Sequence, residues 1–260
     1  MNIKTSLLGL LIYAAMGLYA AAFAAGWRRG GRWSRRLFNA GFAVALGAVL
    51  FRGLSAERWP LQNLFEVFLA MGALVWPLAL PARRLPVPGA RLDPLLGFLV
   101  LWPAGFVLAE TLRPLPPALQ SPLFAPHVLV YLGAYLLLAK AAAVSALQFA
   151  GASPEQRDAT DRSAHALASW GFPLLTLGLL LGAWWGKLAW GDYWHWDPKE
   201  LWSLATWLLY AGYFHARKVL GRGSERLYAV LLLAGFAAII LTLSWVNLSR
   251  LFGGLHSYAV

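Results

Sequence analysis

The chain consists mainly of long apolar runs separated by short polar segments. A membrane-spanning helix needs about 20 mostly apolar residues. Eight stretches reach this length or come close to it: 5–25, 37–54, 62–80, 94–110, 127–149, 165–186, 201–216 and 227–248. Spanning backbone must satisfy its hydrogen bonds internally, and the alternation typical of a membrane barrel is missing from the sequence. The pattern therefore predicts an all-α, polytopic membrane protein of eight transmembrane helices.

The segments between the runs are rich in Pro, Gly, Arg and Asp, which are typical of loops, and no soluble domain fits between them. We therefore expect a single integral membrane domain over residues 1–260. The first run, with Lys4 ahead of it, also resembles a secretory signal peptide. Because the basic cluster 27–36 follows it at once, we interpret the run as an uncleaved span.

Composition agrees with a membrane protein. Hydrophobic residues make up 60% of the chain and charged residues only 13%, which excludes both a soluble globular domain and a disordered chain. The absence of cysteine excludes disulfides, thiolate catalysis and metal sites with cysteine ligands.

The net charge of +11 predicts orientation rather than nucleic-acid binding. If the N-terminus is outside, 14 of the 22 Lys and Arg residues fall in cytoplasmic loops. Those loops are 27–36, 81–93, 150–164 and 217–226. Since positive charges favour the cytoplasmic side, we expect both termini outside.

Tryptophan is concentrated in one place. Seven of the 14 tryptophans lie between 184 and 207, around an external loop predicted over 187–200. Its core reads Trp190-Gly-Asp-Tyr-Trp-His-Trp-Asp-Pro-Lys-Glu-Leu-Trp202. An interfacial aromatic belt explains part of this density. A platform for a large flat ligand such as porphyrin also explains the interleaved polar residues.

This core resembles the tryptophan-rich "WWD" signature of the cytochrome c assembly family, which includes CcsA (also called ResC), CcmC and CcmF. Its one departure is His195 within the motif. The stretch Trp59-Pro-Leu-Gln-Asn-Leu-Phe-Glu66 resembles a motif that opens an early span in CcsA proteins, with Phe65 where Tyr is commoner.

Two further stretches carry the resemblance toward the C-terminus. The first is Phe214-His215-Ala-Arg217, which resembles the family's histidine segment near the end of the span after the motif. The second is the tail, where Val246-Asn247 and Gly254-Leu-His-Ser-Tyr258 resemble the C-terminal pattern of the family. The resemblance thus covers about 57 to 258. Eight spans and this tail favour the CcsA/ResC type.

Two histidines are predicted on the same side as the tryptophans. From the residues alone, His127 is equally well explained by a helix start facing headgroups, and His256 by a solvated tail. The resemblance implies that both bind the iron of an outer haem, a bis-histidine site. It also implies that Trp190, Trp194, Trp196 and Asp197 bind the porphyrin. We expect Asp197 and Glu200 to cap the next helix, with Pro198 at its first position.

The other histidines differ. His215 lies 15 residues after Glu200, which is about 22 Å along a helix and too deep for the outer site. The resemblance implies an inner haem site there, with a second ligand from a CcsB/ResB-like membrane subunit; a place in the juxtamembrane basic cluster is the alternative. His165 and His195 are expected mainly to pack. The alternatives are that His165 lines the entry to the inner site and that His195 forms a hydrogen bond to a propionate.

Charged residues on the outer side have further candidate roles. Glu66 needs a polar partner, which we expect near Asn63, because a lone charge in a span is costly. Several basic residues are candidates for pairing with haem propionates: Arg58, Arg113, Lys187 and Lys199.

The resemblance implies a haem-handling subunit of a holocytochrome c synthase, or haem lyase, in the bacterial inner (plasma) membrane. Such a subunit moves haem b to the outer face and presents it to apocytochrome c bearing C-x-x-C-H. No catalytic residue is assigned. The expected partners are haem, apocytochrome c, the CcsB/ResB-like subunit and the bilayer, with no nucleic acid. A HemX-like regulatory membrane protein and a small-molecule transporter are the alternatives.

Overall fold

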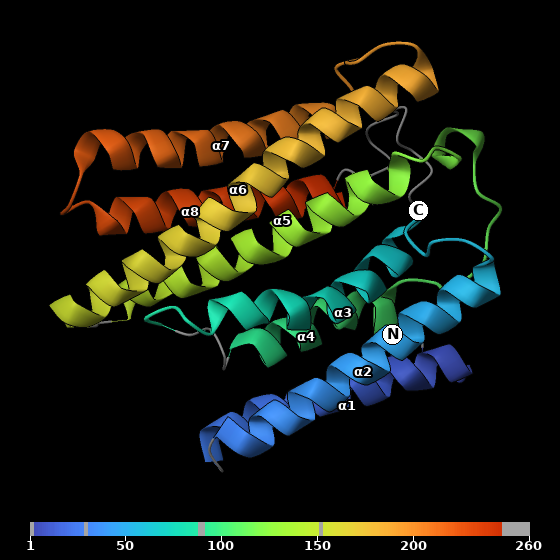
Figure 1. Ribbon diagram of the computed structural model, residues 1–260, viewed down its shortest axis with the longest axis horizontal. Helices are drawn as coiled ribbons and strands as arrows, with labels where there is room; N and C mark the ends of the chain where they lie inside the picture. Colours follow the sequence, from blue (N-terminus) through green and yellow to red (C-terminus); the bar gives the residue numbers. More distant parts are fainter. Residues whose placement is uncertain (1–2, 29–30, 88–91, 151–152, 246–260) are drawn as a thin grey trace. The chain divides into compact units, whose positions relative to one another are not determined.

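The computed structural model describes residues 3–28, 31–87, 92–150 and 153–245 (Figure 1). Within these ranges the regular structure is entirely helical, which confirms the all-α prediction. The α-helices are α1 (Leu7–Arg28), α2 (Gly31–Ala56), α3 (Leu64–Ala82), α4 (Leu92–Trp102), α5 (Phe124–Ser145), α6 (Pro154–Trp190), α7 (Pro198–Leu220) and α8 (Glu225–Ile240). The short helices are η2 (Pro103–Val107), η3 (Pro117–Leu119), η4 (Ala146–Phe149) and η5 (Leu241–Trp245).

Six of the described helices are long and apolar enough to cross a membrane: Leu7–Gly26, Gly31–Ala56, Leu64–Ala82, Phe124–Phe149, Pro154–Trp190 and Glu225–Ser244. The apolar helix Leu92–Val107 is shorter than a span. Helix α7 has 23 residues, but polar and charged side chains in its first and last turns lower its hydropathy. The spans expected at 94–110 and 201–216 therefore stay predictions.

The described chain forms two compact units. The first comprises the described residues within 1–83 and 89–115, and the second comprises those within 84–88 and 116–260. In the first unit, α1 packs against α2 and α4, and α3 packs against α2 and α4. In the second, α5 packs against α6 and α8, and α7 packs against α8. The expected single domain stays a prediction.

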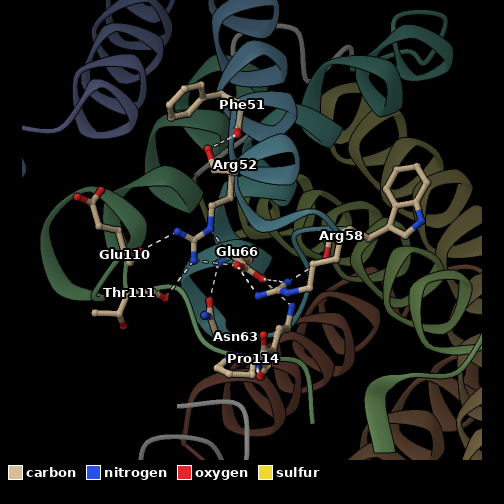
Figure 2. A network of polar contacts seen from close by, with 11 residues as sticks. Phe51, Arg52, Arg58, Asn63, Glu66, Glu110, Thr111 and Pro114 are labelled. Atoms are coloured by element: carbon tan, nitrogen blue, oxygen red, sulfur yellow. Dashed lines mark hydrogen bonds and ion pairs between the residues drawn. The ribbon is translucent and has the colours of Figure 1, made fainter. Parts of the chain in front are cut away.

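A buried ion cluster joins α2, α3 and the segment after η2 within the first unit (Figure 2). The carboxylate of Glu66, at the start of α3, is fully buried and binds two guanidinium groups, each at 2.9 Å. One belongs to Arg52 in α2 and the other to Arg58 in the following turn. Asn63 caps α3 by accepting a hydrogen bond from the Glu66 backbone N–H at 3.0 Å, so it does not itself pair with the Glu66 carboxylate.

The same cluster anchors the segment after α4. Arg52 also donates to the carbonyl oxygens of Glu110 at 2.7 Å and Thr111 at 3.1 Å. The Gln62 side chain donates to the Pro114 carbonyl at 3.0 Å, and its backbone N–H donates to Glu66. Arg58, a candidate propionate partner, is thus engaged by Glu66 within its own unit.

Candidate functional site

The ring of His127 lies against α6. His127 is the fourth residue of α5, and its Nδ1 is 2.9 Å from the carbonyl oxygen of Gly178. One face of the imidazole lies near Trp185, with centroids 5.8 Å apart and planes 28° apart. Tyr131 contacts it in a T-shaped arrangement at 5.0 Å. These contacts hold the ring in a single position.

Trp185 connects His127 with the predicted tryptophan segment. Its indole is almost completely buried and donates to the Ala118 carbonyl at 2.9 Å. Trp190 packs against it at 4.8 Å, and His195 packs against Trp190 at 6.1 Å. The structure therefore brings His127 and Trp190 into one aromatic cluster. Sequence reasoning did not select Trp185, although its place seven residues after Gly178 puts both on one helix face.

The loop between α6 and α7 is shorter than expected. Helix α6 continues to Trp190 and ends at Gly191, whose φ of 92° is left-handed and suits glycine. Lys187, in the last turn, donates to the Gly191 carbonyl at 2.7 Å and lies over the Tyr193 ring. Helix α7 begins at Pro198, so the loop is 191–197, which we call the tryptophan loop.

The end of the tryptophan loop is fixed to α7 by a capping box, as predicted. Asp197 accepts from the Lys199 backbone N–H at 2.9 Å. In return, Glu200 accepts from the backbone N–H groups of Asp197 at 3.2 Å and His195 at 2.7 Å. The capping role of Asp197 is thus confirmed, and its contact with porphyrin stays a prediction.

Two buried polar atoms in this loop have no hydrogen-bond partner among the described residues: Trp194 Nε1 and His195 Nδ1. The nearest carboxylate oxygen to His195 Nδ1, on Glu200, is 3.8 Å away. A buried donor without an acceptor is destabilising unless a ligand or water supplies one. A flat molecule that bears a carboxylate fits this loop, because the carboxylate can accept from the Trp194 indole N–H while the flat part packs on the aromatic faces.

Trp196 has an unusual backbone. Its φ is 57°, a left-handed value that is rare for a bulky residue, and its side chain is 66% exposed. Trp194 lies perpendicular to it at 6.0 Å. Strain of this kind persists where surrounding contacts enforce it and is commonest at binding sites.

Lys199, in the first turn of α7 ahead of its apolar stretch, gives a pH-dependent prediction. Although the residue is partly exposed, burial of its ammonium lowers its pKa to about 8, and the Asp197 carboxylate opposes this shift. Between pH 8 and about 10.5 Lys199 holds its proton in the unfolded chain and loses it in the folded chain. Its contribution to the free energy of unfolding therefore rises with pH over this range. Thermal unfolding should show Lys199→Met more stable than the parent at pH 7, with the gap narrowing toward pH 10.5. A gap that is constant with pH would contradict this assignment.

The remaining histidines lie apart from this cluster. His165 Nδ1 is 3.1 Å from the Tyr213 hydroxyl, and its ring packs against Phe214 at 5.7 Å, which agrees with the expected packing role. His215 is exposed in the C-terminal part of α7, at the end away from the tryptophan loop. His256 lies outside the described residues, so its pairing with His127 stays a prediction.

Comparison with known proteins identifies the family. The model of the family described as "Cytochrome C assembly protein" matches residues 6–253. "Cytochrome c biogenesis protein CcsA" of Synechococcus elongatus is 33% identical, with 85% of this chain and 84% of that protein aligned. The protein of the same name from Guillardia theta is also 33% identical, over 80% and 79% respectively.

A solved structure shares the fold. "Cytochrome c Heme Lyase CcmF" superposes with a TM-score of 0.71 over 94% of this chain, at 19% identity. The chain spans about half the length of that protein, 48% of it. With a family match from residue 6 to residue 253 and relatives that are 33% identical over most of this chain and of their own length, the chain belongs to the cytochrome c assembly protein family, as a multi-pass membrane protein that acts in cytochrome c biogenesis.

Proposed function

We propose that this chain is the haem-handling subunit of a cytochrome c synthase, which carries haem b to the outer membrane face and presents it to apocytochrome c. The observation that carries the proposal is the cluster of His127, Trp185 and Trp190 beside the tryptophan loop. The cluster supplies an imidazole and aromatic faces, and Trp194 in the tryptophan loop adds a buried indole N–H without an acceptor among the described residues. These are the groups that an iron porphyrin with propionates needs.

In this proposal His127 and His256 would hold the iron of the outer haem. Trp190, Trp194, Trp196 and Asp197 line the porphyrin, and the Trp194 Nε1–H donates to a propionate. When bound, the haem supplies vinyl groups that the two thiols of a C-x-x-C-H segment add to. The thiols belong to the substrate, and the substrate histidine replaces one of the two ligands from this chain.

His215 is the proposed ligand of an inner site. Its exposure on α7 supports this, because a second chain can reach an exposed imidazole. The other ligand comes from a CcsB/ResB-like partner in the bacterial inner membrane. The helices Leu92–Val107 and α7 complete the eight spans, with both termini outside.

The test is expression in a host that lacks its own cytochrome c assembly system, with and without the CcsB/ResB-like subunit. We expect a purified complex with a low-spin bis-histidine b-type spectrum and covalent haem on a reporter cytochrome. His215→Ala should lower the haem recovered with the complex.

Other outcomes identify the alternatives. A colourless protein that does not bind added haem would favour a transporter. A haem-binding protein that matures no cytochrome, even with the partner, would favour a regulatory protein of the HemX type. Both results would contradict the proposed presentation of haem.

A further inference from the structure

The His127 ring occupies a space on α6 that exists because position 182 is glycine. A Cβ atom at Gly182 would stand 2.6 Å from His127 Cε1 and 3.1 Å from Nδ1. The first distance is far inside van der Waals contact, so any side chain at 182 would displace the ring. One turn earlier, a Cβ at Gly178 would stand 3.0 Å from the Tyr131 ring.

The ring has little room to yield to such a displacement. Its Nδ1 is held at 2.9 Å by the Gly178 carbonyl oxygen, which is fixed in the backbone of α6. The Trp185 indole stacks on one face of the imidazole. It is 1% exposed and donates a hydrogen bond to the Ala118 carbonyl oxygen. Tyr131 contacts the ring edge-on. A shift away from Gly182 would therefore break the bond to Gly178 or the contact with Trp185.

The bond to Gly178 also determines which ring nitrogen carries the proton. A carbonyl oxygen only accepts hydrogen bonds, so Nδ1 must be the donor. In the neutral imidazole the lone pair then resides on Nε2, the nitrogen through which the ring binds a metal. A backbone carbonyl in this position orients a ligand imidazole and increases its basicity.

We infer that Gly178 and Gly182 are positioning residues for His127: the Gly178 carbonyl fixes the Nδ1–H tautomer, and the missing side chain at Gly182 admits the ring. The inference rests on the proposed function, because it names Nε2 of His127 as the nitrogen that faces the iron. It assigns to α6 a role in the outer site through its backbone alone.

Gly182→Ala tests this, with Gly212→Ala as the matched control. Gly212 lies in α7 of the same unit, and a Cβ there would meet nothing within 4 Å. After reconstitution with haem, Gly182→Ala should bind about tenfold more weakly and lose the low-spin signal in absorption and electron paramagnetic resonance. Added imidazole, which replaces a displaced ligand, should restore the low-spin signal. Gly212→Ala should match the parent, and a parent-like Gly182→Ala spectrum overturns the inference.

A second measurement uses the haem-free protein and separates misfolding from positioning. Gly182→Ala should lower the thermal midpoint of the parent but not that of His127→Ala, because the clashing ring is then gone. An equal decrease in both backgrounds overturns the inference. If His127→Ala alone leaves the haem spectrum unchanged, the proposed iron ligand is wrong, while the thermal comparison still decides whether Gly182 accommodates the ring.

Discussion

Glu66→Ala is expected to lower the free energy of unfolding by about 3–5 kcal/mol, because it leaves two guanidinium groups without their buried counter-ion. The Glu66 side chain is 0% exposed, and those of Arg52 and Arg58 are 4% and 13% exposed. Equilibrium unfolding in mixed micelles would measure the loss. Glu155→Ala, at an exposed acid, should lower the free energy of unfolding far less than Glu66→Ala does.

A double-mutant cycle separates this ion cluster from general loss of packing. In Arg58→Ala the carboxylate keeps Arg52, so that variant should be the milder of the two. The combined variant should be more stable than the two single effects predict, by at least about 1 kcal/mol. Strict additivity would show that Glu66 and Arg58 do not stabilise one another.

His127→Ala is the replacement with the largest expected effect on function. It removes the imidazole between Gly178 and Trp185 while keeping the buried indole and its bond to Ala118. We expect cytochrome c maturation to fall at least about tenfold, since loss of an iron ligand exceeds the loss of a group that merely orients one. Haem-stained gels of the reporter cytochrome and the spectrum of the purified complex measure the two effects.

His165→Ala is the matched control for that replacement. Its imidazole lies in the same unit but contacts Tyr213 and Phe214. Normal maturation by His127→Ala without added imidazole would show that the outer ligand lies elsewhere.

Local sequence signals predicted the local structure well. The capping box at Asp197 and Glu200 was predictable because its hydrogen bonds join residues three positions apart. Six span-length apolar helices followed from run length alone. Helix α7 fell outside that set because its first and last turns carry charged residues, although its middle is apolar. Mean hydropathy therefore does not decide whether α7 crosses the membrane.

Tertiary partners were less predictable. Sequence reasoning placed a partner of Glu66 near Asn63 and did not identify Arg52, which is 14 residues away on another helix. Likewise, it selected Trp190 but not Trp185, the indole that contacts His127. Choosing among seven neighbouring tryptophans requires knowing how α6 is rotated against α5, and only packing determines that rotation.

The length of α6 has a consequence for where water meets the protein. Its 37 residues extend about 55 Å, whereas the hydrocarbon core of a bilayer is about 30 Å thick. More than ten residues must therefore project into the headgroups or beyond, even with tilt. The N-terminal third is the polar part, and Asp161 within it binds Arg217 of α7 through two hydrogen bonds. An ion pair thus links α6 and α7 at a position that can lie at the aqueous boundary. There, water solvates both charged groups, so the pair does not have to be buried among apolar side chains.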